Sequence, residues 1–274
     1  LPPAVLISEG EMALFAGDYE TAREIFREGL STTDPQDLAE SRYGLGRALY
    51  ELGNYGLARD QFQSAALSED PAIAARAKIL LGKTFTQLER YQEALLAYEA
   101  ALALQPGLID AHIHELRGDL FNTLGDYPSA IEAFEAAYLN DPYGGNETQE
   151  VKIAVATQNA GQVDTALELY QSIYASSGND YTKAQMNLRI GRIYLERDQP
   201  EQATPYLQDS VNNFPFAFDA YTALVLLLDA GQEVNEVQRG MINFYVRQYA
   251  LAIEAFDRYL ASGAEERADA ALYH

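Results

Sequence analysis

The chain has 274 residues, of which 48% are hydrophobic and 22% charged, and 41 acidic against 19 basic residues give a formal net charge of -22. This composition permits a sizeable buried core and excludes an intrinsically disordered chain. The negative charge disfavours nucleic acid or an anionic membrane as the partner, because both are bound through cationic surfaces. The lack of cysteine excludes disulfides, thiolate zinc sites and thiol nucleophiles.

The chain opens Leu1-Pro2-Pro3, without the basic segment that begins a signal peptide. Its longest apolar stretch, residues 220–228, is well short of the ~20 residues that a membrane-spanning helix needs. We therefore expect a soluble chain with no membrane span. The opening suits a mature exported protein, so the expected compartment leans toward the bacterial cell envelope, although composition alone assigns none.

A period of 36 residues runs through the first two thirds of the sequence. The first column of the repeat consists of small residues: Gly10, Gly46, Gly82, Gly118 and Ala154. A second column falls where a turn is expected: Gly17, Gly53, Glu89, Gly125 and Gly161. A third column is aromatic: Phe26, Phe62, Tyr98, Phe134 and Tyr170. Columns that keep one phase over five copies indicate tandem structural repeats.

Each repeat contains two amphipathic helical patterns separated by a short turn. In the third repeat we expect helices over residues 75–88 and 92–104, the second with an apolar stripe of Leu95, Tyr98 and Leu102. Prolines such as Pro35, Pro71 and Pro106 follow the second helix, and we expect them to stop it. A helical hairpin cannot bury its apolar face alone, whereas stacked hairpins can.

The packing role of two columns follows from residue size. Gly46 and Gly82 are expected to let the two helices of a hairpin approach closely. Aromatic residues such as Tyr55 and Phe62 are expected to fill the space between adjacent hairpins.

The run Gly82…Tyr91-x-x-Ala94-x-x-x-Tyr98-x-x-Ala101-Leu102-x-x-x-Pro106 resembles the tetratricopeptide repeat (TPR) family. The resemblance implies an all-α, right-handed superhelical solenoid of stacked antiparallel helix pairs. It extends over nearly the whole chain, so we predict a single TPR-like solenoid over residues 1–274. Two departures are the 36-residue unit, against the usual ~34, and the missing Trp near the start of the unit. The residues in that place are Arg42, Lys78 and His114.

The later repeats are less regular. We expect regular repeats over about 3–178, a looser repeat over 180–215 and a last repeat over 234–262. The step from Gly191 to Gly240 exceeds the period by thirteen residues, which predicts an extra helix over 217–230. Residues 264–274 are expected to start a further repeat. Such an uncapped end predicts a fragment of a longer protein, or docking onto a partner or a second copy.

The sequence offers little material for catalysis. His112 and His114 lie two positions apart, hence on different sides of a helix. His112 and Glu115 are expected to form a solvated polar pair rather than part of a zinc site. Gly44-Leu45-Gly46 follows no strand, so it is interpreted as helix packing and not as a phosphate loop. We predict no catalytic residue, no metal and no cofactor.

In the TPR family the first helix of each pair lines a concave groove, and carrying over those positions gives the candidate binding residues. They are Tyr43, Arg47, Tyr50, Arg76, Lys83, His112, Glu115, Asp119, Asn122 and Gln158. Tyr and Arg are enriched at binding hot spots, although exposed helix residues of these types are also common. Arg47, Arg76 and Lys83 are expected to form a basic stretch, followed by an acidic stretch after Gly118.

Two functions remain open at this point. The first is a non-catalytic scaffold that binds a peptide or helix of a partner protein in its groove. The alternative is the non-catalytic superhelical arm of a larger bacterial cell-envelope enzyme. It rests on the last repeat, Arg239-Gly240…Gln248-Tyr249-x-x-Ala252, which resembles repeats found ahead of lytic transglycosylase domains.

Overall fold

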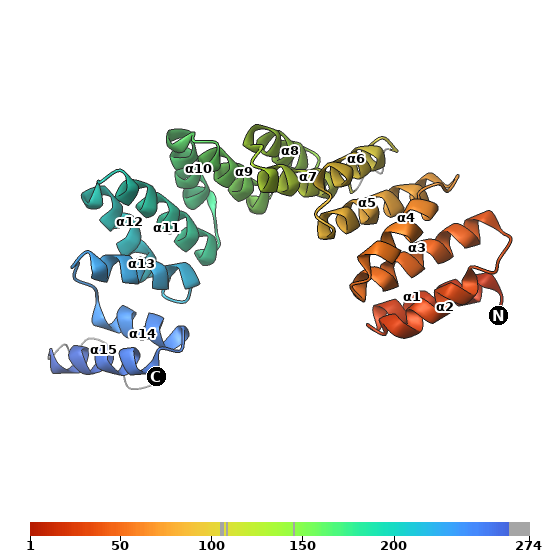
Figure 1. Cartoon of the computed structure of the whole chain (residues 1–274). Coiled ribbons are helices and arrows are strands. Elements are labelled where there is room, and N and C mark those ends of the chain that lie inside the picture. Colours follow the sequence, from red (N-terminus) through yellow and green to blue (C-terminus); the bar gives the residue numbers. More distant parts are fainter. Residues whose placement is uncertain (105–106, 108, 145, 263–274) are drawn as a thin grey trace. The chain divides into compact units, whose positions relative to one another are not determined.

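The computed structural model describes residues 1–104, 107, 109–144 and 146–262, and over these residues the chain is all-helical (Figure 1). The predicted fold class of stacked antiparallel helix pairs is confirmed. None of the helices within these residues is long and apolar enough to cross a membrane. Pro106, residues 264–274 and the self-association expected of that end lie outside the described residues.

The chain divides into two compact units, Leu1–Gln149 and a second unit beginning at Glu150. The expectation of a single solenoid stays a prediction. The first unit stacks four hairpins. Their helices are α1 (Pro3–Phe15) with α2 (Tyr19–Gly29), α3 (Pro35–Glu51) with α4 (Tyr55–Ala65), α5 (Pro71–Gln87) with α6 (Tyr91–Leu102), and α7 (Asp110–Leu124) with α8 (Tyr127–Leu139).

Within the described residues, the second unit contains three hairpins, and one further helix without a second helix of its own lies between the second and third hairpins. The hairpins are α9 (Glu147–Asn159) with α10 (Val163–Ser176), α11 (Asp180–Glu196) with α12 (Pro200–Asn213), and α14 (Glu236–Tyr245) with α15 (Tyr249–Ala261). The intervening helix is α13 (Phe218–Asp229), which packs against both α11 and α12.

The first helix of a hairpin carries its small residue directly under a large side chain of the second helix. A Cβ added to Gly82 would lie 2.4 Å from the Tyr98 ring, and one added to Gly240 would lie 2.3 Å from the Phe256 ring. The sequence distance is 16 residues in both hairpins, although Gly240 lies outside the 36-residue phase. The close helix approach expected at Gly46 and Gly82 is therefore confirmed, because only a residue without a side chain fits beneath the ring.

The aromatic column serves contacts within hairpins as well as between them. Phe62 packs on Gly46 of its own hairpin. Phe26 contacts Gly10 of its own hairpin and Gly44 of the next one. Tyr55 meets the ring of Tyr50, again within one hairpin, with centroids 5.3 Å apart. Tyr55 and Phe62 thus both make ring contacts inside their own hairpin, where Gly46 leaves room for the Phe62 ring. That they also fill the space between adjacent hairpins stays a prediction.

Pro35 and Pro71, two of the prolines that follow a second helix, have a different role from the one expected. α2 ends at Gly29, and Pro35 is the first residue of α3. A proline fits that position because its missing N–H would have no intrahelical partner. The preceding Asp34 accepts hydrogen bonds from the backbone N–H groups of Gln36 and Asp37, at 2.9 and 3.0 Å. An Asp-Pro pair therefore starts the next helix instead of stopping the previous one.

Candidate functional site

Tyr43 lies between two arginines on the first helices of neighbouring hairpins. Its ring is 8% exposed. The guanidinium carbon of Arg76, from α5, is 4.8 Å from the ring centroid, and that of Arg47, from α3, is 5.6 Å away. These are cation–π distances. Burial raises the pKa of the Tyr43 hydroxyl, and the two arginines oppose that shift.

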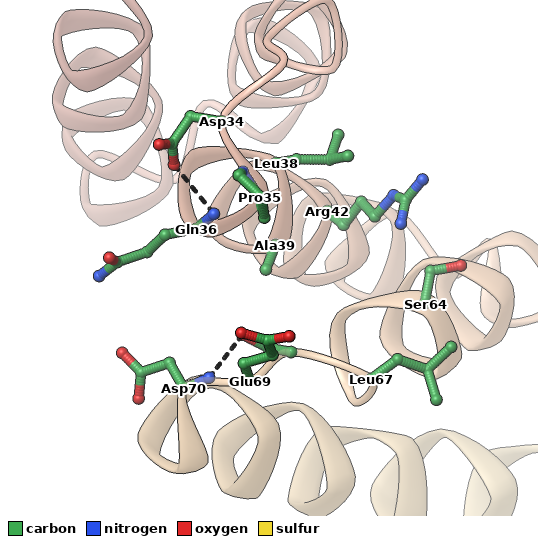
Figure 2. A pocket seen from close by; sticks show the side chains of 11 residues that line it. Asp34, Pro35, Gln36, Leu38, Ala39, Arg42, Ser64, Leu67, Glu69 and Asp70 are labelled. Carbon is green, nitrogen blue, oxygen red and sulfur yellow. Dashed lines mark hydrogen bonds between the residues drawn. The ribbon is translucent and has the colours of Figure 1, made fainter.

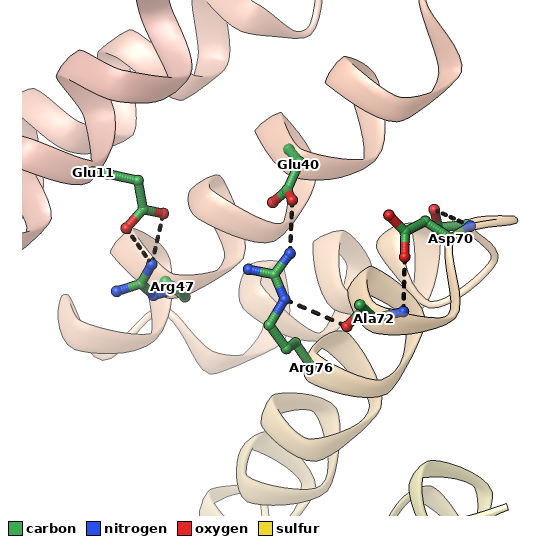
Figure 3. A network of polar contacts seen from close by, with 7 residues as sticks. Glu11, Glu40, Arg47, Asp70, Ala72 and Arg76 are labelled. Carbon is green, nitrogen blue, oxygen red and sulfur yellow. Dashed lines mark hydrogen bonds and ion pairs between the residues drawn. The ribbon is translucent and has the colours of Figure 1, made fainter. Parts of the chain in front are cut away.

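Both arginines are also ion-paired with the preceding hairpin (Figure 3). Arg47 Nη1 donates to both carboxylate oxygens of Glu11 at 2.7 Å, and Arg76 Nη2 donates to Glu40 at 2.6 Å. Each pair joins residues 36 positions apart, which are equivalent positions of neighbouring repeats. The expected basic stretch is therefore largely neutralised within the protein. Of its three members, Lys83 alone takes part in no ion pair within the described part of the chain.

Lys83 lines a pocket of about 290 Å³ that brings together candidates from three first helices. Tyr50 of α3, Lys83 of α5 and Asp119 of α7 all contribute to its wall. Burial raises the pKa of Tyr98, which also lines the pocket, to about 12. Tyr50 is half-buried, and burial raises its pKa as well. The other lining residues are Thr86, Gln87, Leu116, Leu120 and Thr123.

The remaining candidates lie apart from this pocket. His112 and Glu115 form the expected polar pair on α7, with 3.4 Å between Nδ1 and Oε2. Asn122 is half-buried on the same helix. Gln158 belongs to the second unit, where it accepts a hydrogen bond of 2.7 Å from the Tyr170 hydroxyl. Gln158 is thus occupied in fixing an aromatic side chain of its own hairpin.

A second, larger pocket was not indicated by the sequence (Figure 2). It has a volume of about 490 Å³ and lies between the first turn of α3 and the connection from α4 to α5. Arg42 and the 84% exposed Leu67 line it, together with Asp34 and Asp70. Both carboxylates cap the helices that follow them. The sequence feature that could have indicated this pocket is Arg42, which stands where the TPR pattern often has a bulky Trp.

The architecture defines the class: a tandem-repeat protein built from stacked helical hairpins. The sequence profile of the tetratricopeptide repeat matches residues 7–73, 43–109 and 79–146, which together exceed half of the chain. The chain belongs to the tetratricopeptide repeat family. Its fold is that of a protein-interaction scaffold.

Solved structures of TPR proteins share this fold. PilF of Pseudomonas aeruginosa matches at 18% identity with a TM-score of 0.58, over 82% of this chain and 97% of that one. YrrB, described as a TPR protein with an unusual peptide-binding site, matches at 18% identity and 0.55, over 73% and 97%. A segment of MamA from Desulfovibrio magneticus matches at 22% identity and 0.53, over 62% and 92%.

No curated protein sequence matches the chain. The three structures concern repeat proteins, so the resemblance of the last repeat to those ahead of lytic transglycosylase domains stays a prediction.

Proposed function

We propose that the first unit binds an extended peptide segment of a partner protein, with one large side chain of that peptide seated in the pocket of Tyr50, Lys83 and Asp119. The observation that carries the proposal is the convergence of these three residues, from three successive first helices, on one pocket. On this proposal the chain binds and does not catalyse.

The size and chemistry of the pocket support this reading. Its volume of about 290 Å³ is at the lower limit of small-molecule sites, about 300 Å³, and therefore suits a single side chain. The apolar part of the lining is the half-buried Leu116 together with Leu120 and Tyr98, which are themselves buried, while Lys83 and Asp119 carry opposite charges. Opposite charges at a rim orient a partner more than they add affinity.

The proposal can be tested with a phage-displayed library of random linear peptides and fluorescence titration of the enriched sequences. Tyr50→Ala and Lys83→Ala should each weaken binding several-fold. Thr123→Arg, which places a long side chain in the pocket from an exposed position of α7, should abolish it. Lys78→Ala is the matched control, because Lys78 is on the same helix as Lys83 but does not line the pocket.

Melting temperatures identify variants that merely unfold. Failure to enrich any peptide, or equal binding by wild type and Thr123→Arg, would refute this site.

A further inference from the structure

A polar pocket of the second unit lies where the C-terminal half of α12 meets the start of α14. Among the described helices, α13 alone has no second helix of its own, and α12 contacts α14 as well as α13. The pocket has a volume of about 540 Å³, which is within the range of ligand sites, about 300–1,000 Å³. Its polar lining consists of Gln208, Asn212 and Asn213 from α12, Glu233 from the connection before α14, and Asn235 and Gln238 at the start of α14.

Amide side chains dominate this lining. Five of the lining residues are Asn or Gln, and among the described residues of the lining Glu233 alone is charged. An amide side chain carries an acceptor oxygen and a donor NH₂ group. A ligand that matches several amides therefore offers neutral donors and acceptors together. A peptide group is such a ligand, because its N–H donates and its C=O accepts.

Internal hydrogen bonds fix which end of two of these amides is left for a ligand. Asn235 Oδ1 caps α14, where it accepts from the backbone N–H groups of Val237 at 2.9 Å and Gln238 at 3.3 Å. The NH₂ group of Asn235 is therefore the end that is left to donate. Asn213 Nδ2 donates to Asp209 Oδ1 at 2.6 Å, which leaves the side-chain oxygen of Asn213 to accept. The pocket thus has an oriented donor on its α14 side and an oriented acceptor on its α12 side.

Three further amides have hydrogen-bonding capacity that the protein does not use. The side chains of Gln208 and Asn212 form no hydrogen bond within the described residues. Gln238 Oε1 is buried and has no hydrogen-bond partner in that part of the chain. A buried acceptor without a partner costs free energy, which an N–H group of a ligand would restore. The oxygen of Gln238 therefore favours a ligand that donates hydrogen bonds.

The geometry of a peptide group accounts for both oriented amides. In a trans peptide group the C=O and the N–H point in opposite directions, so one group between α12 and α14 can accept from Asn235 and donate to Asn213. A helical segment would not do this, because its backbone groups are bonded to one another. A nucleobase is disfavoured as well, because no aromatic ring is among the described residues of the lining to stack on it. The complementary ligand is an extended polypeptide.

We propose that this pocket, the amide pocket, holds the main chain of an extended peptide segment of a partner protein. Asn235 donates to a C=O of that peptide, and Asn213 accepts from one of its N–H groups. Recognition through the main chain tolerates many side chains, and Glu233 favours a basic one beside it. The amide pocket belongs to the second unit, so it is independent of the pocket proposed above in the first unit.

The experiment uses the full chain with Thr123→Arg, which fills the first-unit pocket, and a phage-displayed library of random linear peptides. Asn235→Asp keeps an oxygen that caps α14, because Asp and Asn are equally good caps, but it replaces the free donor by an acceptor. It should weaken the binding of enriched peptides about tenfold or more in fluorescence titrations. Asn179→Asp is the matched control and should change nothing. Asn179 caps α11 through the same contact, to the N–H of Tyr181 at 2.9 Å, and does not line the pocket.

A second measurement separates main-chain recognition from side-chain recognition. The backbone N–H groups of an enriched peptide are methylated one at a time, and its side chains are replaced by Ala one at a time. At one position at least, N-methylation should cost about tenfold or more in affinity, while Ala at that position costs about threefold or less.

Four results would overturn the proposal. They are the absence of any enriched peptide, equal binding with and without Asn235→Asp, an equal loss from Asn179→Asp, and binding that no N-methylation weakens. Titration with chitotetraose tests a sugar as the other ligand: binding of this sugar that Asn235→Asp weakens, without binding of any peptide, would assign the amide pocket to a carbohydrate and refute the proposal. Because the first-unit pocket is filled during the selection, failure here leaves the function proposed for that pocket standing.

Discussion

Glu40 and Arg76 lie 36 residues apart in sequence and 2.6 Å apart in space, between Oε1 and Nη2. Glu11 and Arg47 repeat this relationship between the first helices of the preceding pair of hairpins, α1 and α3, at 2.7 Å. A residue and its equivalent in the next repeat are thus neighbours across the interface of two hairpins. Opposite charges at equivalent positions thus link neighbouring hairpins through ion pairs. Both arginines are engaged in these pairs and are less available to a partner.

The strength of the Glu40–Arg76 pair should nevertheless be modest, because the two side chains are 26% and 42% exposed. We expect a double-mutant cycle with Glu40→Gln and Arg76→Gln, measured by urea unfolding, to give a coupling of about 0.2–1 kcal/mol. Raising the salt concentration should reduce it further. A coupling of several kcal/mol would contradict the view that these are surface pairs.

Substitution of glycine tests the close contact between the helices of a hairpin. Gly82→Ala would place a Cβ 2.4 Å from the Tyr98 ring, and we expect a loss of about 1–3 kcal/mol from overpacking. Gly56→Ala is the matched control, since nothing lies within 4 Å of its added Cβ on α4. That change should stabilise the protein by about 0.5–1 kcal/mol through helix propensity. Equal thermal shifts for the two variants would refute the assigned packing.

The fold could be predicted from sequence because its signals are local and repeated. The columns of Gly82, Glu89 and Tyr98 reflect contacts inside one hairpin, so they recur wherever the hairpin recurs. The ion pair of Arg47 with Glu11 could also have been predicted, because the two residues carry opposite charges and lie one period apart. That prediction requires the further assumption that equivalent positions of neighbouring repeats are in contact.

Other features of the structure depend on side-chain contacts that do not follow the 36-residue period of the sequence. Asp209 Oδ2 accepts hydrogen bonds from the Tyr174 hydroxyl at 2.7 Å and from the buried Asn187 side chain at 2.6 Å. These partners are 35 and 22 residues away, on α10 and α11, so the cluster follows no single period. The pocket shared by Tyr50, Lys83 and Asp119 likewise depends on side-chain volumes between three helices, which a list of groove positions does not give.

The turn column makes a prediction about backbone strain. Gly17, Gly53 and Gly125 end first helices in the left-handed region, with φ between 75° and 77°, but Glu89 holds the same place at φ 57°. A residue with a side chain loses roughly 1–2 kcal/mol of stability in that region. Replacing it by glycine removes this cost, but part of the gain is cancelled because glycine has more conformational freedom in the unfolded chain. Glu89→Gly should therefore raise stability by about 0.5–1 kcal/mol.

The reverse change, Gly53→Ala, should lower stability by about 1 kcal/mol, because alanine carries the left-handed cost. Chemical denaturation of both variants measures whether the free energy of unfolding rises for Glu89→Gly and falls for Gly53→Ala. Destabilisation by Glu89→Gly would mean that the Glu89 side chain contributes more than its backbone costs.

Alkaline pH should destabilise the protein through its buried tyrosines. Burial raises the pKa of Tyr98 to about 12, and burial together with the hydrogen bond to Asp209 raises that of Tyr174 to about 12. An unfolded tyrosine titrates near pH ~10. Above that pH the folded state binds more protons than the unfolded state, so the free energy of unfolding falls between about pH 10 and pH 12 and is unaffected below this window.

Tyr174→Phe separates the contribution of this hydroxyl. The variant removes one charge-assisted hydrogen bond to Asp209, which should cost about 1.5–3 kcal/mol at neutral pH. It should also make the alkaline fall in stability shallower, because one of the raised pKa values is gone. Tyr143→Phe is the matched control, since Tyr143 is 96% exposed and should change neither quantity. Urea unfolding of the three proteins at pH 8 and pH 11 measures both effects, and an unaltered alkaline fall in Tyr174→Phe would show that this hydroxyl titrates as in the unfolded chain.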